Sequence, residues 1–274
     1  MDVEDRPLVS APRASRRGDQ AYHRFWHEVG DAFPDLGGAP STAFYRENEI
    51  RLLEGSLPPL TGLRILKTDL WDEAKNTRIL QWVASRGALA FGVDLSAPIT
   101  RDARRNFGSV PLRGAVADVR ALPFRDAAFD AVYSMGTVEH FDETEQAVCE
   151  IHRVLRPGGI AVIGVPNRHD PFLRPALAAL LQSLDWYSYG YEKSYSRRTW
   201  RRILERAGFD VLDQSGILFV PGWLRMLDLW CHTSARPLTR LTRVAIAPFV
   251  WLHRRVPATH RYGYLLASVA RRPD

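Results

Sequence analysis

The chain has 274 residues, of which 46% are hydrophobic and 25% charged, as is ordinary for one large globular domain. It contains no repeat, low-complexity tract or cluster of metal ligands, so we predict no metal site. The two cysteines lie far apart, which favours a reducing cytoplasm. We expect no secretory signal, because the first residues are polar. The longest apolar run, Val244–Leu252, is too short to span a bilayer.

The net charge of +6 is unevenly spread along the chain. Nine arginines and a single acidic residue, Asp228, fall between Gln214 and Arg272, which gives this segment a net charge of +8. Such a basic face serves solubility, or it attracts an anionic lipid surface, a phosphate-bearing substrate or nucleic acid. Nucleic acid is disfavoured because the arginines are dispersed and no nucleic-acid module is recognisable. We therefore predict no nucleic-acid partner.

Residues 1–18 are polar and predicted to be disordered, and residues 19–274 are predicted to form one domain. Its N-terminal segment, 19–57, carries helical patterns at Gln20–Asp31 and Thr42–Glu54. Short apolar strands then alternate with helices, which is typical of a parallel sheet buried on both faces. The predicted strands are Arg64–Thr68, Leu89–Asp94, Val110–Val116, Phe129–Ser134 and Ile160–Pro166. The predicted helices are Glu73–Ser85, Ala97–Asn106 and Asp142–Leu155, and a turn is predicted at Pro157–Gly159.

The pattern changes after Asn167. Two helices are predicted at Pro171–Leu184 and Ser196–Ala207, and two strands at Phe209–Val220 and Gly263–Val269. Residues 221–261 between these strands form a basic helical insertion, far longer than a hairpin loop requires. Apolar residues fall near helical spacing beside two arginines, at Leu238, Leu241, Ala245, Leu252, Arg240 and Arg243. This stripe predicts either an amphipathic helix at a membrane surface, which delivers a lipid-linked substrate, or a helix packed on the domain or across a dimer.

Two carboxylates stand at predicted strand ends, where a parallel sheet forms its ligand crevice. Asp94 ends its strand in FGVDLSAP and can accept both hydroxyls of a ribose, or it can cap the next helix. Ser96 is equally suited to the cap. Asp118, in GAVADVRALPF, can accept a hydrogen bond from an exocyclic amine, or it can form a turn.

The segments ALPFRDAAFDAVYSMGTVEHF and EIHRVLRPGGIAVIGVPN, between Asp118 and Pro166, are more specific. Together with GVDLS they resemble the class I S-adenosylmethionine-dependent methyltransferases. The resemblance covers Arg64 to Pro166, and RAGF with the last strand extends it to the chain end. It implies an α/β fold with a Rossmann-like, doubly wound, seven-stranded and mostly parallel sheet of strand order 3-2-1-4-5-7-6. It also implies S-adenosyl-L-methionine as cofactor.

The resemblance further implies contacts at particular positions. Asp94 corresponds to the ribose carboxylate, and Asp118 with Val119 corresponds to the adenine contacts. The implied cofactor-binding residues are Lys67, Thr68, Asp69, Asp94, Leu95, Asp118, Val119, Ser134, Met135 and Gly136. His140, in the EH pair, is a candidate general base toward a substrate hydroxyl, or a structural histidine bonded to backbone in the crevice wall. His169 and Tyr191 are further candidates.

The loop after the first strand departs from the family pattern. The family places an acid and three glycines where this chain has Lys67, Asp69, Trp71 and Glu73. Lys67 suits the carboxylate of the methionine end, and Asp69 or Asp72 suits its amine. Three alternatives follow: the cofactor binds through a rearranged loop, the protein has lost cofactor binding, or the site accepts a different adenosyl or nucleotide ligand. Binding of S-adenosylmethionine distinguishes them.

From these features we predict an S-adenosylmethionine-dependent methyltransferase that acts on a small-molecule, glycan or lipid-linked acceptor, at oxygen. The alternative is a non-catalytic binding or scaffold protein of the same fold. The expected location is the cytoplasm, with peripheral membrane contact through residues 221–261 if the basic stripe faces lipid.

Overall fold

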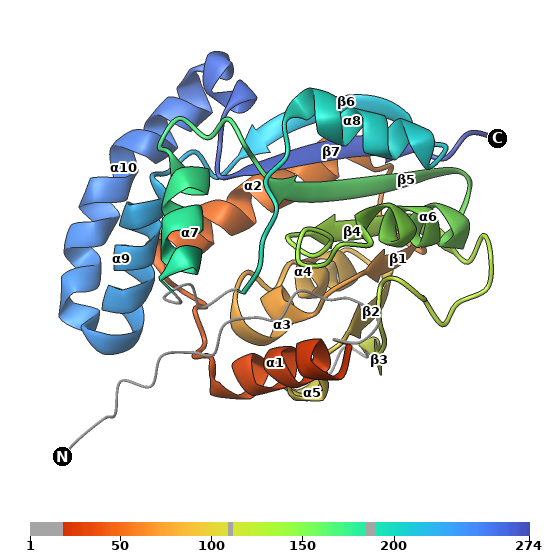
Figure 1. The fold of residues 1–274 in the computed structure, drawn as a ribbon, viewed down its shortest axis with the longest axis horizontal. Coiled ribbons are helices and arrows are strands. Elements are labelled where there is room, and N and C mark those ends of the chain that lie inside the picture. The colour runs from red at the N-terminus through yellow and green to blue at the C-terminus, as the bar shows by residue number, and fades with distance from the viewer. Residues whose placement is uncertain (1–18, 109–111, 185–189) are drawn as a thin grey trace.

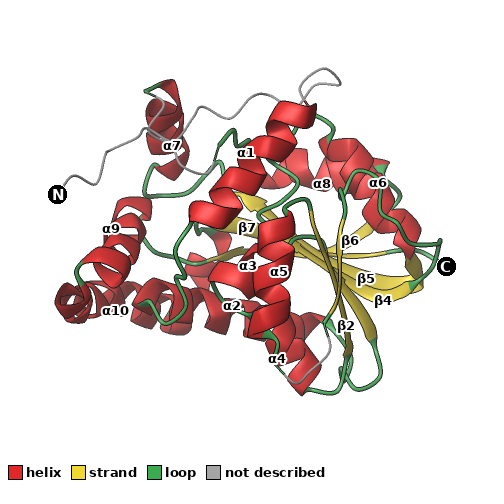
Figure 2. Ribbon diagram, turned by 90° about the horizontal axis from the view of Figure 1, so that it is seen from below, coloured by secondary structure: helices red, strands yellow, loops and turns green. Residues whose placement is uncertain are grey.

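The computed structural model describes residues 19–108, 112–184 and 190–274. They form a seven-stranded sheet with helices on both faces (Figures 1 and 2). The strand order is β3-β2-β1-β4-β5-β7-β6, and β7 runs antiparallel to both of its neighbours. The strands are β1 Arg64–Lys67, β2 Leu89–Asp94, β3 Arg113–Val116, β4 Phe129–Met135, β5 Leu155–Pro166, β6 Asp210–Ile217 and β7 Leu265–Arg271. This topology confirms the predicted fold class. The predicted disorder of residues 1–18 lies outside the described residues, as does the start of the strand predicted at Val110–Val116.

Helices connect the strands and cover the sheet (Figure 2). They are α1 Asp19–Ala32, α2 Pro40–Ser56, α3 Trp71–Lys75, α4 Ile79–Ser85, α5 Ala97–Asn106, α6 Thr144–Val154, α7 Arg174–Ser183, α8 Arg197–Arg206, α9 Gly222–Ser234 and α10 Thr239–Arg255. Two short 3₁₀ segments, η1 Arg236–Leu238 and η2 Pro257–Arg261, flank α10. The two N-terminal helices and the helical insertion therefore occur where the sequence predicts them.

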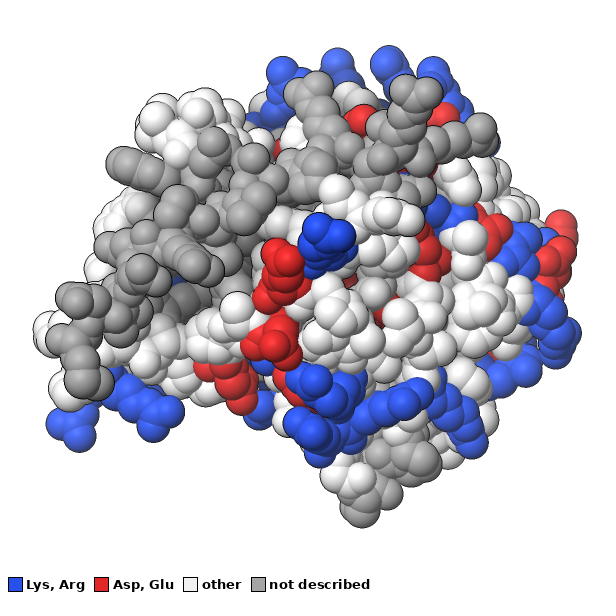
Figure 3. Space-filling model, turned by 60° about the horizontal axis from the view of Figure 1, so that its bottom comes forward, with Lys and Arg blue, Asp and Glu red and all other residues white. Residues whose placement is uncertain are grey.

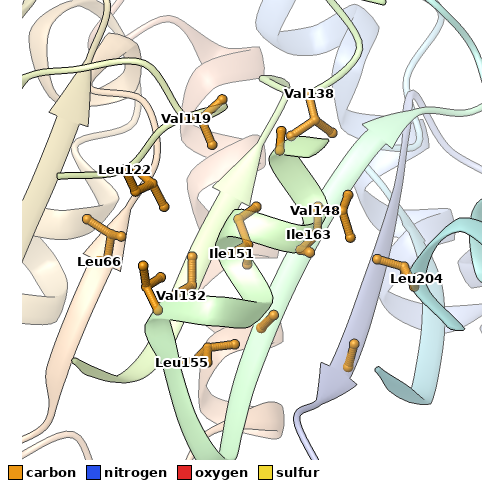
Figure 4. Packing of buried hydrophobic residues seen from close by; sticks show 14 of the residues in the cluster. Leu66, Val119, Leu122, Val132, Val138, Val148, Ile151, Leu155, Ile163 and Leu204 are labelled. Carbon is orange, nitrogen blue, oxygen red and sulfur yellow. The ribbon is translucent and has the colours of Figure 1, made fainter. Parts of the chain in front are cut away.

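The core has two layers because successive side chains of a strand point to opposite faces of the sheet. Leu66 and Val132 face the layer under α6 and α8, where Ile151 and Leu204 are fully buried (Figure 4). Their neighbours in sequence, including Ile65, face the layer under α2, α4 and α5. Each fully buried aliphatic side chain contributes about 1.5–3 kcal/mol. Burial on both faces explains why the strands read as continuous apolar runs.

The single helix predicted at Glu73–Ser85 is wrong, because the structure has two short helices, α3 and α4. The break lies at Asn76–Arg78, where Arg78 takes a left-handed conformation with φ 55°. The carbonyl of Asp72 accepts the N–H groups of both Asn76 and Arg78, and the Glu73 carboxylate accepts the N–H of Leu80. The chain therefore closes one helix and opens another within three residues.

The turn predicted at Pro157–Gly159 is also wrong, because these residues lie within β5. The pairing of β4 with β5 shifts there from Phe129 opposite Leu155 to Ala131 opposite Ile160. Extra residues on β5 are thus accommodated as an irregularity in the strand, with Gly158 at φ 71°.

The insertion packs as an antiparallel pair of helices, α9 and α10, beside α2 (Figure 1). The buried carboxylate of Asp228 fastens the pair, since it accepts the N–H of Ser41 at 2.8 Å and the hydroxyl of Thr242 at 2.5 Å. Of the apolar stripe, Leu238, Leu241 and Ala245 are exposed and Leu252 is half-buried, whereas the packing of α10 is made by other residues such as the buried Ile246. The stripe therefore faces mainly solvent. No helix in the described part of the chain is long and apolar enough to cross a membrane.

Candidate active site

A pocket opens at the carboxyl ends of β1, β2 and β4, where the order of a doubly wound sheet reverses. One end lies beside β2 and β3, and the other extends under the insertion toward α7 and α9. Its lining residues are Tyr22, Trp26, Leu36, Tyr45, Thr68, Asp69, Trp71, Asp72, Asn76, Asp94, Leu95, Ser96, Ile99, Ala117, Asp118, Val119, Met135, Gly136, Thr137, Glu139, His140, Phe141, Arg174, Glu192, Arg225, Tyr264 and Leu265. Eight of the ten predicted cofactor residues are in this set; Lys67 and Ser134 are not.

Lys67 lies behind the pocket wall and is fully buried. Its Nζ contacts the Asp69 carboxylate at 2.8 Å, the Asp69 carbonyl at 3.1 Å and the Asp72 carboxylate at 3.1 Å. Burial alone would lower the pKa of Lys67, but the two carboxylates outweigh it and raise this pKa, so the ammonium stays charged. Lys67 therefore holds the loop together from beneath, and its charge is already paired.

The loop extends this network to two other elements. Asp69 accepts a hydrogen bond from Thr137 after β4 at 2.9 Å, and Asp72 accepts one from Asn76 at 2.8 Å. Asn76 in turn accepts from Thr42 of α2. The carboxylates of Asp69 and Asp72 still line the pocket, so the loop presents negative charge to a ligand.

Space for the loop's side chains comes from the neighbouring strand. Gly92 of β2 pairs with Lys67 of β1, and a Cβ atom at Gly92 would lie 2.4 Å from the Leu70 side chain. Leu70 is fully buried in the core. The absence of a side chain at Gly92 thus lets the glycine-free loop fold down onto the sheet.

Asp94 ends β2 and lines the pocket. Its two carboxylate oxygens accept the N–H groups of Leu70 at 2.8 Å and Ser96 at 2.7 Å. The Ser96 hydroxyl accepts from Ile99 and caps α5, as the sequence suggested. Each Asp94 oxygen retains a second lone pair for a ligand hydroxyl. Burial raises the pKa of Asp94 to about 7, although the two N–H groups oppose this shift.

Asp118 and Val119 line the same end of the pocket. The Asp118 carboxylate pairs with the Arg120 guanidinium at 2.6 Å and accepts the Arg120 N–H at 2.8 Å. Arg120 lies over the rings of Tyr22 and Phe141. Asp118 therefore both forms a turn and lines the pocket. A ligand amine that bonds to the Asp118 carboxylate would share it with Arg120.

The end of β4 forms the floor of the pocket. Met135 and Gly136 line it, and Gly136 has a φ of 75° that favours glycine. Ser134 is fully buried and accepts a hydrogen bond from Thr68 at 2.7 Å. Ser134 thus positions Thr68, which does line the pocket.

One ring nitrogen of His140 is bonded to backbone, as in the structural role considered from the sequence, and the other is not. Its Nδ1 lies 2.8 Å from the Tyr191 carbonyl, which can only accept, so Nδ1 carries the proton. Nε2 then holds the lone pair of a potential base, 3.9 Å from the Glu139 carboxylate. Burial lowers the pKa of His140, so the ring is neutral at pH 7. Burial and the nearby Glu192 raise the pKa of Glu139 well above its usual range.

Several pocket residues were not predicted from the sequence. Arg174 of α7 pairs with Glu192 at 2.7 Å, and both are buried. Arg225 of α9 enters the pocket from the insertion. A signal for Arg225 does exist: Arg225 and Asp228 are three residues apart in the otherwise apolar GWLRMLDLW, which places both charges on one helix face. His169 is exposed and does not line the pocket, and residues 186–189 of the aromatic stretch 186–196 lie outside the described residues.

Residues 75–163 match a family described as a methyltransferase domain. The chain is 32% identical over 200 residues to malonyl-[acyl-carrier protein] O-methyltransferase of Geobacter sulfurreducens, covering 64% of this chain and 73% of that protein. It is 28% identical to ubiquinone biosynthesis O-methyltransferase of Rhizobium etli, covering 61% and 67%. The solved S-adenosylmethionine dependent methyltransferase from Mesorhizobium loti has the same fold, with a TM-score of 0.56 at 21% identity over 86% of this chain and all of that one.

The sheet order and the pocket at its switch point define a Rossmann-like α/β protein. With these relatives, the chain belongs to the class I S-adenosylmethionine-dependent methyltransferases. S-adenosyl-L-methionine is its cofactor, and the enzymatic interpretation is favoured over the non-catalytic one. The family match begins at residue 75, just after the glycine-free segment Ile65–Glu73.

Cofactor binding is expected to weaken as the pH falls below about 7. We propose that a ribose hydroxyl donates to the ionised form of Asp94, and burial raises the pKa of this carboxylate to about 7 in the free protein. Protonation therefore competes with the ligand, and the dissociation constant for S-adenosylhomocysteine should rise by up to about tenfold per pH unit below that pKa. Calorimetry from pH 5.5 to 8.5 measures this slope. Asp94→Asn should bind more weakly and lose the slope, and an unchanged slope in this variant would show that another group titrates.

Proposed function

We propose that the protein transfers the methyl group of S-adenosylmethionine to an oxygen atom of a small-molecule, glycan or lipid-linked acceptor. The cofactor supplies an electrophilic methyl group on a sulfonium. The charges of the pocket fit it, because the carboxylates of Asp69, Asp72 and Asp94 face a ligand that carries a sulfonium and an amine. The residues proposed to hold it are Thr68, Asp69, Asp94, Leu95, Asp118, Val119, Met135 and Gly136, with Lys67 and Ser134 supporting them from behind.

Oxygen is the proposed acceptor atom because a hydroxyl must lose its proton as it is methylated. His140 Nε2 lies in the pocket wall with its lone pair available and its ring neutral. Trp26 packs edge-on against the ring, with the centroids 4.9 Å apart, and fixes its plane. Two relatives named as O-methyltransferases support the same acceptor atom.

One observation, the orientation of α9, supports a lipid-linked acceptor. This helix buries Arg225 and Asp228 together with Leu224 and Leu229 on its inner face. Its outer face is apolar as well, with Trp223 57% exposed and Trp230 55% exposed beside the exposed Met226 and Leu227. Further exposed apolar side chains lie on and beside α7 and α10, at Leu173, Leu180, Leu241, Val244 and Trp251. In Figure 3, basic side chains lie along the lower edge of the left end, beside the white surface that is visible there.

We name this set of exposed apolar residues on α7, α9 and α10 the outer apolar surface. Aromatic side chains next to arginines are suited to the headgroup region of an anionic bilayer. Because α9 also lines the pocket, an acceptor held in such a bilayer would reach the pocket along this helix. Arg240 and Arg243, beside the surface, supply the charge complementarity.

The protein is expected to float with vesicles that contain anionic phospholipid and to remain at the bottom of the gradient with zwitterionic vesicles. The Trp223→Ser/Trp230→Ser variant should lose at least about tenfold in vesicle partitioning, since each buried indole contributes over 1 kcal/mol. The matched control is Val116→Ser/Leu212→Ser, which removes two exposed apolar residues from β3 and β6. Recovery of the wild-type protein in the soluble fraction at low salt would refute the membrane contact.

A further inference from the structure

The structure places one cationic side chain of the insertion inside the pocket. Arg225 projects from the first turn of α9 and is only 8% exposed. Its guanidinium lies between two aromatic rings, 5.4 Å from the centroid of Tyr45 on α2 and 5.5 Å from that of Tyr264 before β7. All three side chains line the pocket. The two rings fix the plane of the guanidinium and shield it from water.

Arg225 has no acidic partner in the described part of the chain. No carboxylate there lies within ion-pair distance of it, and its buried Nη1 has no hydrogen-bond acceptor. Asp228, three residues along the helix, is already bonded to Ser41 and Thr242. A buried charge without a partner is unfavourable, so its retention in a pocket indicates a ligand anion that completes it.

The neighbourhood of Arg225 indicates which anion this is. Asp69 and Asp72 line the same pocket as Tyr45 and Arg225, and the Arg225 guanidinium lies over the Tyr45 ring. Negative charge and positive charge therefore line one pocket. An α-amino acid carries its ammonium and its carboxylate on one carbon and needs this arrangement of opposite charges.

We infer that Arg225 binds the α-carboxylate at the methionine end of the cofactor, opposite an ammonium site at Asp69 and Asp72. Lys67, the sequence-based candidate for this carboxylate, is fully buried and paired with both acids, so it does not serve. The insertion between β6 and β7 thereby completes the cofactor site. Its helix α9 carries the anion-binding residue on one face and the outer apolar surface on the other.

The test compares two ligands that differ only in the carboxylate, S-adenosylmethionine and decarboxylated S-adenosylmethionine. The wild-type protein is expected to bind the first at least tenfold more tightly. In Arg225→Gln, the dissociation constant for S-adenosylmethionine should rise by 10- to 100-fold, while that for the decarboxylated ligand stays within twofold. Arg225→Lys should recover part of the affinity, because it keeps the charge without the planar fork.

Arg236→Gln is the matched control, since it removes an exposed arginine from the same insertion and should leave both constants unchanged. Thermal unfolding of each variant, with and without decarboxylated ligand, identifies any loss of the fold. The inference fails if Arg225→Gln binds S-adenosylmethionine like the wild type, which would assign Arg225 to an acidic group of the acceptor. It fails equally if the variant weakens both ligands to the same extent, because the effect would then be structural.

Discussion

Replacing Lys67 with methionine is expected to weaken S-adenosylhomocysteine binding by at least about 100-fold, a loss of roughly 3 kcal/mol. Methionine matches the length of the lysine stem but removes the ammonium that joins Asp69 to Asp72. Two buried carboxylates would then repel each other across the loop. Removing one partner of a buried ion pair costs about 3–5 kcal/mol. Isothermal calorimetry with S-adenosylhomocysteine measures the binding loss directly.

The control for this result is Lys75→Met, the same substitution in the last turn of α3. Lys75 pairs with Asp102 at 3.0 Å and does not line the pocket, so its replacement should change the affinity by less than threefold. Lys67→Met/Asp72→Asn should recover part of the stability lost in Lys67→Met, since one of the unpaired charges is gone. If Lys67→Met binds the ligand like the wild type, the loop does not depend on this ion pair.

His140→Gln is expected to reduce the rate of methyl transfer by about 100-fold or more, as is usual when a general base is removed. Glutamine can still donate to the Tyr191 carbonyl, but it offers no basic nitrogen in place of Nε2. Cofactor affinity should change little. The assay follows the radiolabelled methyl group of S-adenosylmethionine into the organic-soluble and water-soluble fractions of a cell extract, with calorimetry for binding.

The pH profile separates a base from a structural histidine. Burial lowers the pKa of His140 below its ordinary value, so its active neutral form is lost only as the pH falls through that lowered pKa. The transfer rate of the wild type, measured at saturating cofactor, should fall on the acid side, and this limb should disappear in His140→Gln. A variant with wild-type rate would remove His140 from the mechanism and leave it as a wall residue.

Much of the fold could be predicted from the sequence because short-range patterns determine it. The apolar runs of β1, β2 and β4 have no alternation, which is the pattern of strands buried on both faces. Asp94 and Asp118 stand at strand ends, and this position alone predicts that they reach the crevice. Ser96 is followed by Ala-Pro, a helix start that needs no tertiary information.

The parts that were missed depend on contacts and burial that the pattern of residue types does not reveal. The break between α3 and α4 is stabilised by Asp72 and Glu73 through groups that the helical pattern does not reveal. Lys67 pairs with Asp69 and Asp72 because it is buried. The sequence of a four-residue strand does not reveal that burial. Arg225 reaches the pocket only because β7 inserts between β5 and β6 and the insertion that precedes it packs beside α2. Its inward position requires the assembled fold.

The contact between Leu70 and Gly92 restricts which substitutions can be accepted, and in which order. A methyl group at position 92 would meet the Leu70 side chain at 2.4 Å while that side chain is locked in the core. A larger residue at position 92 is therefore tolerated only if a smaller residue already replaces Leu70. Replacing Leu70 alone, with Gly92 unchanged, leaves a void between the two positions. The two positions form an epistatic pair that links the loop after β1 to strand β2. Grafting the family's glycine loop onto this chain would therefore have to change that loop and β2 together.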